Sequence, residues 1–431
     1  MNTELYKAAL EYHRADPAGK VAIEVTKPMV TQLDLSLAYS PGVAAACEEI
    51  ARDPNEAFTL TGRANLVGVI TNGTAVLGLG AIGALAAKPV MEGKAALFKK
   101  FSGINVFDIE IEERDPAKFV DIVAGLEATF GGINLEDIKA PECFEIEQAL
   151  RERLNIPVFH DDQHGTAIIV VAALLNGLRL VGKQIDTVKL VVSGAGAAAI
   201  TCLDLLVKLG MKKENITVTD IAGVVYQGRS EEMDRWKACY AIETGARTLS
   251  DVIEGADIFL GLSAGGVLRP EMVARMADAP LIFALANPTP EIFPEDAKAV
   301  RPDCIIATGR SDYPNQVNNA LCFPFIFRGA LDVGATDFSD EMKITCVHAL
   351  ADIAAAEVPD VVREVYGEGV LHFGPDYIIP KPFDPRLILE IAPAVARAAM
   401  DSGVATRPLP DLEAYRERLR QFISSGSFYS Q

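Results

Sequence analysis

Several features that would place a chain in a membrane or an oxidising compartment are missing from this sequence of 431 residues. The seven cysteines are scattered and form no C-x-x-C pair, which is typical of buried thiols and not of disulfides. The N-terminus has no apolar core of the signal-peptide kind. The longest apolar run, residues 167–175, is too short to span a bilayer. These absences predict a cytoplasmic protein without a membrane partner.

An excess of positive charge is also missing. Lysine and arginine number 40 against 59 aspartates and glutamates, so the formal net charge is −19. This balance argues against a nucleic acid or an anionic membrane as the partner. No internal repeat or low-complexity tract is present, and half of the residues are apolar. The length therefore predicts two or three packed domains.

A strand–turn–helix–strand pattern occupies residues 188–220. The apolar run 188–192 leads into a glycine-rich turn and a helix through Leu209, and a second strand, 216–219, ends at Asp220. The turn matches the dinucleotide-binding pattern, with alanine at its third glycine position, through Gly194, Ala195, Gly196, Ala197 and Ala198. Glycines let the backbone approach a pyrophosphate, and the helix N-terminus offers unpaired N–H groups. Because Asp220 stands where an acid binds a ribose hydroxyl, the pattern predicts hydride chemistry.

A second glycine-rich segment, residues 78–83, matches the same fingerprint better by letter. Pro89 follows soon after it, and we expect this proline to break the long helix that the motif needs. We therefore interpret residues 78–83 as a structural turn.

Alternation of short strands with helices predicts an α/β fold with parallel sheets. We expect strands at 66–70, 104–107, 155–159, 257–263, 281–287 and 304–308, a buried helix at 166–180, and a helix from Asp384-Pro385 toward Met400. Residues 1–35 read as a polar arm. The predicted domains are an N-terminal α/β domain (1–155), a Rossmann-type doubly wound parallel sheet domain (156–390) and a C-terminal helical tail (391–431).

Four acids stand near the expected ends of elements. Glu136 and Asp137 follow a turn-rich segment, 131–135, whereas Asp161 and Asp162 lie between a strand and the buried helix. Such acids are costly unless a cation or hydrogen-bond donors neutralise them. Oxygen ligands alone would suit Mg²⁺ or Mn²⁺. For Asp161 and Asp162 simple helix capping is the alternative.

Other polar residues allow a functional and a structural interpretation. His160 and His164 straddle a strand-to-helix junction, so we expect hydrogen-bonded histidines and not a zinc pair. Lys94 is either a surface lysine that extends its charge into water or, in a dry site, a base with a lowered pKa. Tyr39 is an ordinary half-buried tyrosine or a reacting group. Three asparagines lie near the ends of expected strands, where ligands or turns are found: Asn287, Asn318 and Asn319.

Taken together, several motifs in one order resemble the malic enzyme family over residues 15 to 400. They are Tyr39-Ser40-Pro41-Gly42-Val43-Ala44, Gly93-Lys94, Leu135-Glu136-Asp137-Ile138, His160-Asp161-Asp162-Gln163-His164-Gly165-Thr166-Ala167, Gly194-Ala195-Gly196-Ala197-Ala198, Asn287-Pro288-Thr289-Pro290-Glu291 and Asn315-Gln316-Val317-Asn318-Asn319. The chain looks most like the bacterial NADP-dependent branch. The resemblance implies oxidative decarboxylation of malate to pyruvate and CO₂, with a divalent metal ion, in a homodimer.

The resemblance also implies roles by position. Glu136, Asp137 and Asp162 match the family's metal ligands, with Asp161 beside them. Lys94 matches the general base, and Tyr39 matches the general acid that protonates the enol. Asn287 and Asn318 would orient the nicotinamide and the substrate, and Asn319 would contribute to the cofactor site.

Some questions stay open at this point. Longer eukaryotic relatives carry a substrate-binding arginine in the segment that matches Thr74-Ala75-Val76, and this chain has none there. Many bacterial relatives continue into an acyltransferase-like domain, so we expect a stand-alone form or a piece of a longer enzyme. Asp220 favours NAD, whereas Arg229 or a nearby lysine would accept the 2′-phosphate of NADP, which the resemblance favours. The rival functions are an inactive dinucleotide-binding regulator and a metal-free amino-acid dehydrogenase.

Overall fold

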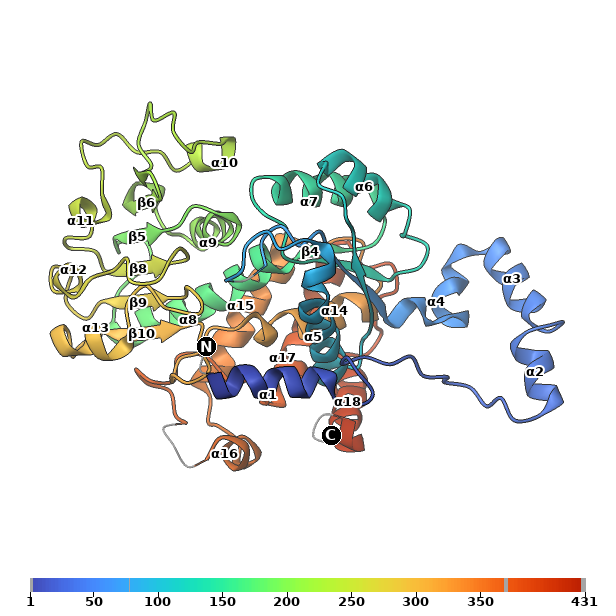
Figure 1. The fold of residues 1–431 in the computed structure, drawn as a ribbon. Helices are drawn as coiled ribbons and strands as arrows, with labels where there is room; N and C mark the ends of the chain where they lie inside the picture. Colours follow the sequence, from blue (N-terminus) through green and yellow to red (C-terminus); the bar gives the residue numbers. More distant parts are fainter. Residues whose placement is uncertain (1–2, 77, 368–370, 428–431) are drawn as a thin grey trace.

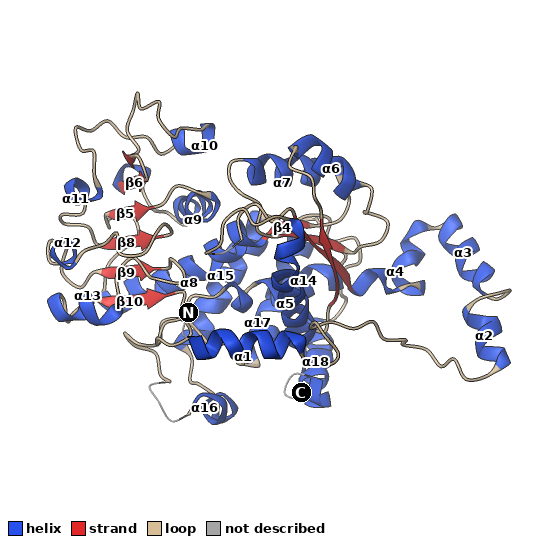
Figure 2. Cartoon of the chain, in the orientation of Figure 1, coloured by secondary structure: helices blue, strands red, loops and turns tan. Residues whose placement is uncertain are grey.

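The computed structural model describes residues 3–76, 78–367 and 371–427. Two mainly parallel sheets stand side by side with a group of long helices between them, as Figures 1 and 2 show. An N-terminal arm extends from the body beside the first sheet. The α/β class with a Rossmann-type sheet, an N-terminal α/β unit and C-terminal helices is therefore confirmed.

The first sheet has four parallel strands in the order β2-β1-β3-β4. They are β1 (Leu66–Thr71), β2 (Asn105–Glu110), β3 (Gly132–Leu135) and β4 (Val158–His160). One face is covered by α6 (Pro116–Ala124) and α7 (Glu142–Arg153), which share a core with Ile70 and Ile133. The other face packs against α5 (Ala84–Ser102) through Val67, Val69 and Phe98. The sheet is thus buried on both faces, as parallel sheets are.

One prediction about this region differs from the structure. The glycine-rich segment 131–135 was expected to be turn-rich, but it contains the fully buried strand β3. A side chain at Gly132 would lie 3.3 Å from the Phe327 ring, so the glycine allows close packing and does not make a turn. The strand β4 pairs with β3, so the first sheet extends beyond the predicted boundary at residue 155.

The second sheet has the order β10-β9-β8-β5-β6-β7, and all its pairs are parallel except the short β6–β7 pair. Its strands are β5 (Leu190–Ser193), β6 (Ile216–Asp220), β7 (Gly223–Val224), β8 (Ile258–Gly261), β9 (Leu281–Ala284) and β10 (Ile305–Thr308). Its helices are α9 (Ala197–Lys208), α10 (Arg235–Ala238), α11 (Leu249–Val252), α12 (Pro270–Val273) and α13 (Pro294–Val300). The strand order reverses between β5 and β8. In open sheets of this kind ligands bind at that reversal, outside the carboxyl ends of the strands.

Long helices join the two sheets into one core. They are α8 (Thr166–Val181), α14 (Phe323–Asp332), α15 (Asp340–Ala355), α17 (Arg386–Asp401) and α18 (Leu412–Phe422). The short helix α16 (Asp360–Tyr366) contributes Val362 to a separate small cluster. The segment Asp161–Val181 is long and apolar enough to cross a membrane by composition, but 67% of it is buried inside the protein. This burial is typical of the core helix that the sequence predicts. The predicted tail boundary at residue 390 falls inside α17.

The prediction that Pro89 breaks a helix is wrong. The helix α5 runs through Pro89 for 19 residues. Proline has no N–H, so the carbonyl oxygen of Leu85, four residues earlier, has no helical hydrogen bond from Pro89. The Leu85 side chain is exposed, so this carbonyl oxygen is open to water. The helix therefore continues to Lys94, which lies one turn further along it.

The N-terminal segment begins with α1 (Thr3–Arg14) and continues through α2 (Gln32–Ala38), α3 (Val43–Arg52) and α4 (Ala57–Leu60). In Figure 1 α2 and α3 stand apart from the body at the end of the arm. Short 3₁₀ turns follow at Pro54–Glu56, Gly62–Asn65, Lys213–Asn215 and Asn319–Leu321, and π-helical turns at Asp161–Gly165 and Ile423–Ser427. All seven cysteines are free thiols, and five of them are buried as predicted, whereas Cys47 and Cys239 are exposed.

Candidate active site

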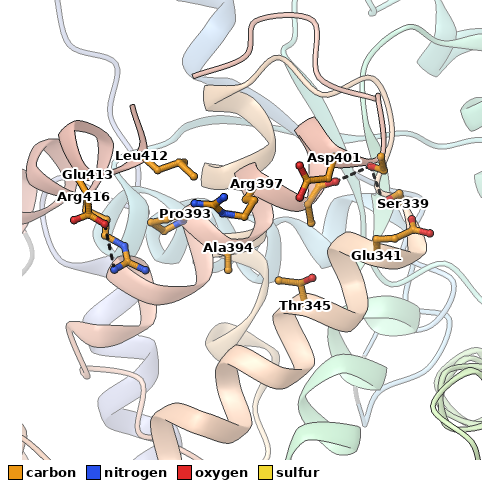
Figure 3. A pocket seen from close by; sticks show the side chains of 12 residues that line it. Ser339, Glu341, Thr345, Pro393, Ala394, Arg397, Asp401, Leu412, Glu413 and Arg416 are labelled. Atoms are coloured by element: carbon orange, nitrogen blue, oxygen red, sulfur yellow. Dashed lines mark hydrogen bonds and ion pairs between the residues drawn. The ribbon is translucent and has the colours of Figure 1, made fainter. Parts of the chain in front are cut away.

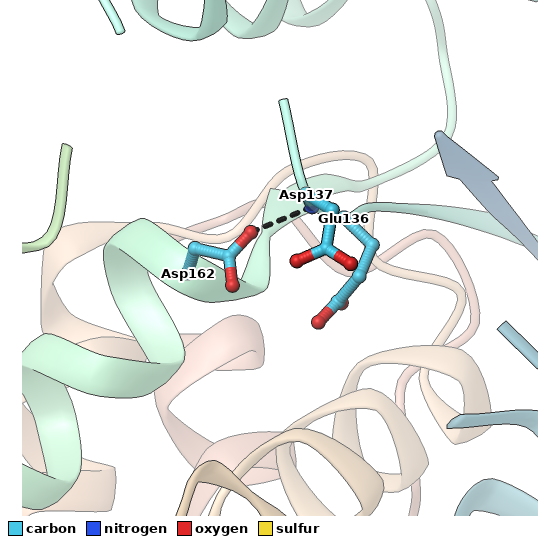
Figure 4. A group of neighbouring side chains, drawn as sticks. All are labelled: Glu136, Asp137 and Asp162. Atoms are coloured by element: carbon cyan, nitrogen blue, oxygen red, sulfur yellow. Dashed lines mark hydrogen bonds between the residues drawn. The ribbon is translucent and has the colours of Figure 1, made fainter. Parts of the chain in front are cut away.

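Three carboxylates meet where two neighbouring strands end. Glu136 and Asp137 follow β3, and Asp162 follows β4, which is paired with β3 in parallel. Parallel pairing places both carboxyl ends at the same edge of the sheet. One oxygen of each carboxylate lies within 4.8 Å of the others, and the Asp162 Oδ2 accepts a 2.7 Å hydrogen bond from the Asp137 N–H (Figure 4). The predicted convergence of acids from two loops is therefore present.

Lys94 approaches the same group from α5. Its Nζ lies 2.9 Å from the Glu136 Oε1 and 2.5 Å from the Asp161 Oδ2, and it stands 4.1 Å from the centroid of the Phe323 ring. The side chain is only 7% exposed, so it is not a surface lysine. Asp161 pairs with Lys94 and is not one of the three clustered carboxylates. This contact agrees with the expectation that Asp161 lies beside the metal ligands and is not one of them.

Burial dominates the electrostatics of the cluster. It raises the pKa of Glu136 to about 7, against the opposing effect of Lys94, and it raises the pKa of Asp137 to about 9, with Asp162 and Glu136 adding to the rise. Burial by itself would lower the pKa of Lys94, but Asp161 and Glu136 outweigh it, so the pKa lies above its ordinary value. The carboxylates beside Lys94 therefore oppose the lowering of its pKa that burial alone would cause.

The donor set fits a hard divalent cation. The three residues supply only carboxylate oxygens, which Mg²⁺ and Mn²⁺ prefer. Among the described residues the buried Asp137 Oδ2 has no hydrogen-bond partner. Asp137 also takes a left-handed backbone conformation, with φ of 55°, which a carboxylate-bearing residue adopts at some cost. A cation would satisfy the free oxygen and lower the repulsion among the acids.

The two histidines do not join this cluster. His164 Nε2 lies 2.9 Å from the Glu147 Oε1, and the other Glu147 oxygen is 3.0 Å away. The backbone N–H of His160 donates to Glu147, whereas its ring Nδ1 lies 3.8 Å from the Asp162 Oδ2, too far for a hydrogen bond. Burial lowers the pKa of His160 to about 4, so its ring is neutral at pH 7. We expected both histidine side chains to be hydrogen-bonded, and the His164 side chain is, to Glu147.

Sequence reasoning missed Glu147, which holds the end of β4 and His164 in place. The residue occurs on the buried face of α7 with Cys143, Ile146 and Leu150. A charged residue on an otherwise apolar helix face was the available signal. Asn134 was missed as well, and its Nδ2 donates to Glu136 at 2.8 Å.

The glycine-rich turn lies at the reversal point of the second sheet. Gly194 has φ of 111°, and a side chain there would meet the Leu262 carbonyl oxygen at 2.3 Å. The Ser193 and Ser263 hydroxyls are 2.8 Å apart across the two strands. The turn segment Asp161–Gly165 packs against α9, which begins just after Gly196. The acidic cluster and the predicted pyrophosphate loop are therefore neighbours.

Asp220 ends β6, where the pattern requires an acid. Its carboxylate accepts hydrogen bonds from the Arg229 guanidinium at 2.8 and 2.6 Å and from the Lys237 Nζ at 3.1 Å. Burial would raise the pKa of Asp220, but these two cations hold it below its ordinary value. Arg229 thus does loop back to this strand end, and Lys237 joins it there.

The asparagines occupy loops at the same edge. Asn287 follows β9, and its Nδ2 lies 3.4 Å from the Leu285 carbonyl oxygen. Asn318 caps the next turn, since its side chain accepts from the Ala320 N–H at 2.9 Å. Asn319 hydrogen-bonds Asp161 and helps to keep that carboxylate charged. Turn chemistry, the structural alternative, thus describes Asn318, while Asn319 contacts the acidic site directly.

The structure does not bring Tyr39 to this site within one chain. The residue caps the C-terminus of α2 at the end of the arm and is 70% exposed. Among the described residues, no tyrosine hydroxyl hydrogen-bonds to Lys94 or to the four acids around it. The Tyr39 of one chain therefore does not reach its expected place beside the Lys94 of the same chain.

A separate surface pocket of about 680 Å³ lies between α15, α17 and α18 (Figure 3). Its lining includes Thr345, Arg397 and Arg416, and none of the residues discussed above. The chemistry of the candidate site is therefore found at the strand ends and not in this pocket.

Comparisons with known proteins agree with this geometry. The family model described as "Malic enzyme, N-terminal domain" matches residues 18–151, and "Malic enzyme, NAD binding domain" matches residues 163–366. The NADP-dependent malic enzyme of Halomonas elongata is 57% identical over 404 residues, which cover 94% of this chain and 96% of that protein. The chain belongs to the malic enzyme family. The two family models together include the candidate-site residues from Tyr39 to Asn319, except His160, Asp161 and Asp162, which lie in the gap between the two matched ranges.

Two further members of the malic enzyme family show what the similarity covers. The NADP-dependent malic enzyme of Escherichia coli is 66% identical over the whole of this chain, but the chain spans only 57% of that protein's length. The crystal structure of malic enzyme from Pyrococcus horikoshii superposes with a TM-score of 0.88 at 41% identity, covering 98% of this chain and 97% of that one. The malic enzyme fold is therefore present across the chain, whereas the longer relatives contain a further part.

Proposed function

We propose that the protein catalyses the oxidative decarboxylation of malate to pyruvate and CO₂, with reduction of NADP and with a bound divalent cation. One observation carries this proposal: Glu136, Asp137 and Asp162 converge beside a dinucleotide-binding loop, with the buried Lys94 in contact with them. An inactive regulator or a metal-free dehydrogenase would have no use for three clustered carboxylates that repel each other. Family membership supports the same reaction.

The three clustered carboxylates would hold Mg²⁺ or Mn²⁺. When bound, the cation supplies positive charge at the C2 oxygen of malate, and the nicotinamide accepts the hydride from C2. The loop at Gly194 and the start of α9 bind the pyrophosphate through backbone N–H groups. Asn287 and Asn318, at the edge where the strands end, orient the substrate and the nicotinamide.

Lys94 acts as the base in this proposal. Its Nζ is held within hydrogen-bond distance of Glu136 and Asp161, so it faces the place where the C2 hydroxyl must lie. A cation held by Glu136 would offset the negative charge beside Lys94 and so would lower the pKa of Lys94. Lys94 then takes the hydroxyl proton as the hydride leaves C2. After the bond between C3 and the C4 carboxylate breaks, Tyr39 donates a proton to C3.

The charges around Asp220 support NADP as the nucleotide. An unpaired acid at this position repels a 2′-phosphate. Here two cations offset that acid, and Arg229 and Lys237 are within reach of a phosphate bound at the end of β6. Replacement Arg229→Ala should raise the KM for NADP at least tenfold and change the KM for NAD little. An equal loss with both nucleotides would mean that Arg229 only supports the fold.

The proposal also covers the partners, the oligomeric state, the compartment and the metal ion of the enzyme. The small-molecule partner is malate, with neither a nucleic acid nor a membrane as a further partner, in keeping with the acidic net charge. We propose a cytoplasmic homodimer. The choice of Mg²⁺ or Mn²⁺ follows from the oxygen-only donors.

The test is an initial-rate assay of malate oxidation, followed by NADPH absorbance, with NAD and NADP compared in the presence and absence of Mn²⁺. We expect pyruvate and NADPH in equal amounts, and loss of turnover in EDTA that Mn²⁺ restores. Undiminished turnover in EDTA would overturn the metal assignment. Replacement Lys94→Ala should abolish turnover while NADPH binding, measured by fluorescence, persists; loss of binding would show a structural role instead.

A further inference from the structure

A glutamate in the second sheet is buried without a positive charge to balance it. Glu291 is 0% exposed and lies after β9, in the loop that contains Asn287. Its carboxylate accepts hydrogen bonds from the Ser263 N–H at 2.9 Å, from the Ser263 hydroxyl at 3.3 Å and from the Ala286 N–H at 3.0 Å. Among the residues that the structure describes, no lysine, arginine or histidine forms an ion pair with Glu291. Buried charges in proteins are normally paired, so this one is a candidate functional group.

The surroundings of Glu291 favour the charged form of its carboxyl group. Burial raises the pKa of Glu291, whereas the hydrogen bonds from Ala286 and Ser263 lower it. One carboxylate oxygen receives the Ser263 N–H and the other receives the Ala286 N–H, an arrangement that a glutamine would not match because its amide nitrogen is a donor. Gly261 makes room for the group, since a side chain there would lie 2.4 Å from the Glu291 Cδ. A negative charge is therefore fixed across the ends of β8 and β9.

This charge lies on the nicotinamide side of the proposed nucleotide site. The adenosine half belongs at the end of β6, where Asp220 stands, and the pyrophosphate belongs at Gly194. The other half of the nucleotide then lies across the strand reversal, over the ends of β8 and β9. Glu291 contacts the loops that follow both of these strands, through Ser263 and Ala286. We therefore expect its carboxylate nearer to the nicotinamide ring than to the adenosine.

Ser263 links the carboxylate to the pyrophosphate loop. Its hydroxyl lies 2.8 Å from the hydroxyl of Ser193, the residue before Gly194. Leu262, the residue before Ser263, packs directly against that loop, because a side chain at Gly194 would meet the Leu262 carbonyl oxygen at 2.3 Å. The path from Glu291 to the nucleotide site therefore runs through hydrogen-bonded groups of the protein and not through open water. A charge in such a place is only weakly screened.

The nicotinamide ring changes its charge during hydride transfer. The oxidised ring carries one positive charge, and it becomes neutral when it accepts the hydride with both electrons of the substrate's C–H bond. We propose that Glu291 determines which redox form of the nucleotide the protein prefers, because its buried carboxylate attracts the cationic ring of NADP and not the neutral ring of NADPH. The inference rests on the proposed function, since it requires a nicotinamide nucleotide at the Gly194 loop. Its consequence is that the charge favours binding of the substrate form and release of the product form.

A purely structural role for Glu291 makes a different prediction. If the carboxylate only ties the loops after β8 and β9 together, its loss should weaken the binding of NADP and NADPH by the same factor, because the two nucleotides differ only in the ring. If its charge acts on the ring, its loss should weaken NADP binding more than NADPH binding. The ratio of the two dissociation constants therefore separates the effect of charge from the effect of packing.

Nucleotide binding by Glu291→Gln tests the inference without turnover. NADPH is titrated by its fluorescence and NADP by displacement of bound NADPH, with metal-free protein at pH 8 and without malate. We expect the ratio of the NADP dissociation constant to the NADPH dissociation constant to rise about threefold or more over the native ratio, since the variant loses a weakly screened attraction between two unit charges. A smaller rise would overturn the inference, even if both nucleotides bind more weakly.

Two matched variants serve as controls. Glu291→Asp keeps the charge but shortens the side chain, so both dissociation constants should rise by the same factor and the ratio should stay native. A change of this ratio as large as that expected for Glu291→Gln would show that packing sets it, and it would overturn the inference even if the glutamine variant does not fold. Glu295→Gln removes an exposed charge on α13, four residues further along, and should leave the ratio unchanged because water screens that charge.

The native protein separates this inference from the proposed function. Native chain that binds neither NADP nor NADPH would refute the proposed function, and the role of Glu291 would fall with it. Native binding of both nucleotides, together with an unchanged ratio in Glu291→Gln, would refute the role of Glu291 alone.

Discussion

Replacing Lys94 by methionine removes a positive charge that Glu136 and Asp161 share inside the protein. Methionine keeps most of the side-chain volume over the Phe323 ring, so the change acts mainly on charge. Removing one partner of a buried ion pair costs about 3–5 kcal/mol, since the remaining charge is neither hydrated nor paired. We expect the metal-free variant to lose that much free energy of unfolding at pH 8.

Lys88 offers a matched control on the same helix. Its Nζ also faces two carboxylates, Asp108 at 2.6 Å and Glu110 at 3.5 Å, but the side chain is 43% exposed against 7% for Lys94. Water already solvates such a pair, so Lys88→Met should cost at most about 1 kcal/mol. Urea denaturation of the three proteins, at one protein concentration, gives the comparison.

The pH dependence provides the sharper test. Burial raises the pKa of both Glu136 and Asp161 to about 7 even with Lys94 present, and without Lys94 both values rise further. A carboxyl group whose pKa is raised in the folded state destabilises that state as pH increases. The deficit of Lys94→Met should therefore be large at pH 8 and should shrink toward pH 5. A deficit that does not depend on pH, or one equal to that of Lys88→Met, would refute the reasoning.

Two further predictions concern the metal ion and the nucleotide. Mn²⁺ should raise the melting temperature more at pH 8.5 than at pH 6, because Glu136 and Asp137, with pKa values of about 7 and about 9, must lose protons to bind it; thermal scans with equal shifts at both pH values would contradict this. Gly194→Ala should weaken NADPH binding at least tenfold in a fluorescence titration, since the new side chain meets a carbonyl oxygen at 2.3 Å, whereas Gly245→Ala, which meets nothing within 4 Å, should bind normally.

The sequence predicted the elements whose local pattern agrees with their packing. The strand–turn–helix at Gly194 and the buried helix α8 were found because glycine spacing and apolar runs are local signals. The strand β3 was missed because its glycines read as a turn, although they serve close packing against Phe327. Pro89 was misread because proline in an early, exposed turn of a helix costs less than in its middle.

The site was predictable only as a set of residues. The motifs indicated which acids belong together, but their distances follow from the parallel pairing of β3 with β4, which is a tertiary property. The pairing of Asp220 with Arg229 and Lys237 needed the same three-dimensional information. No local pattern could place Tyr39, because the residue lies on an N-terminal arm whose helices α2 and α3 bury no side chain in their own chain.

The central claim is that acids from two strand ends together form one cation site, and titration of Mn²⁺ into the metal-free protein tests it most directly. Calorimetry without nucleotide or substrate should show one ion bound per chain. In Asp162→Asn the affinity should fall at least tenfold, although the replaced residue follows β4 and not β3. The same affinity and stoichiometry in this variant would contradict the account.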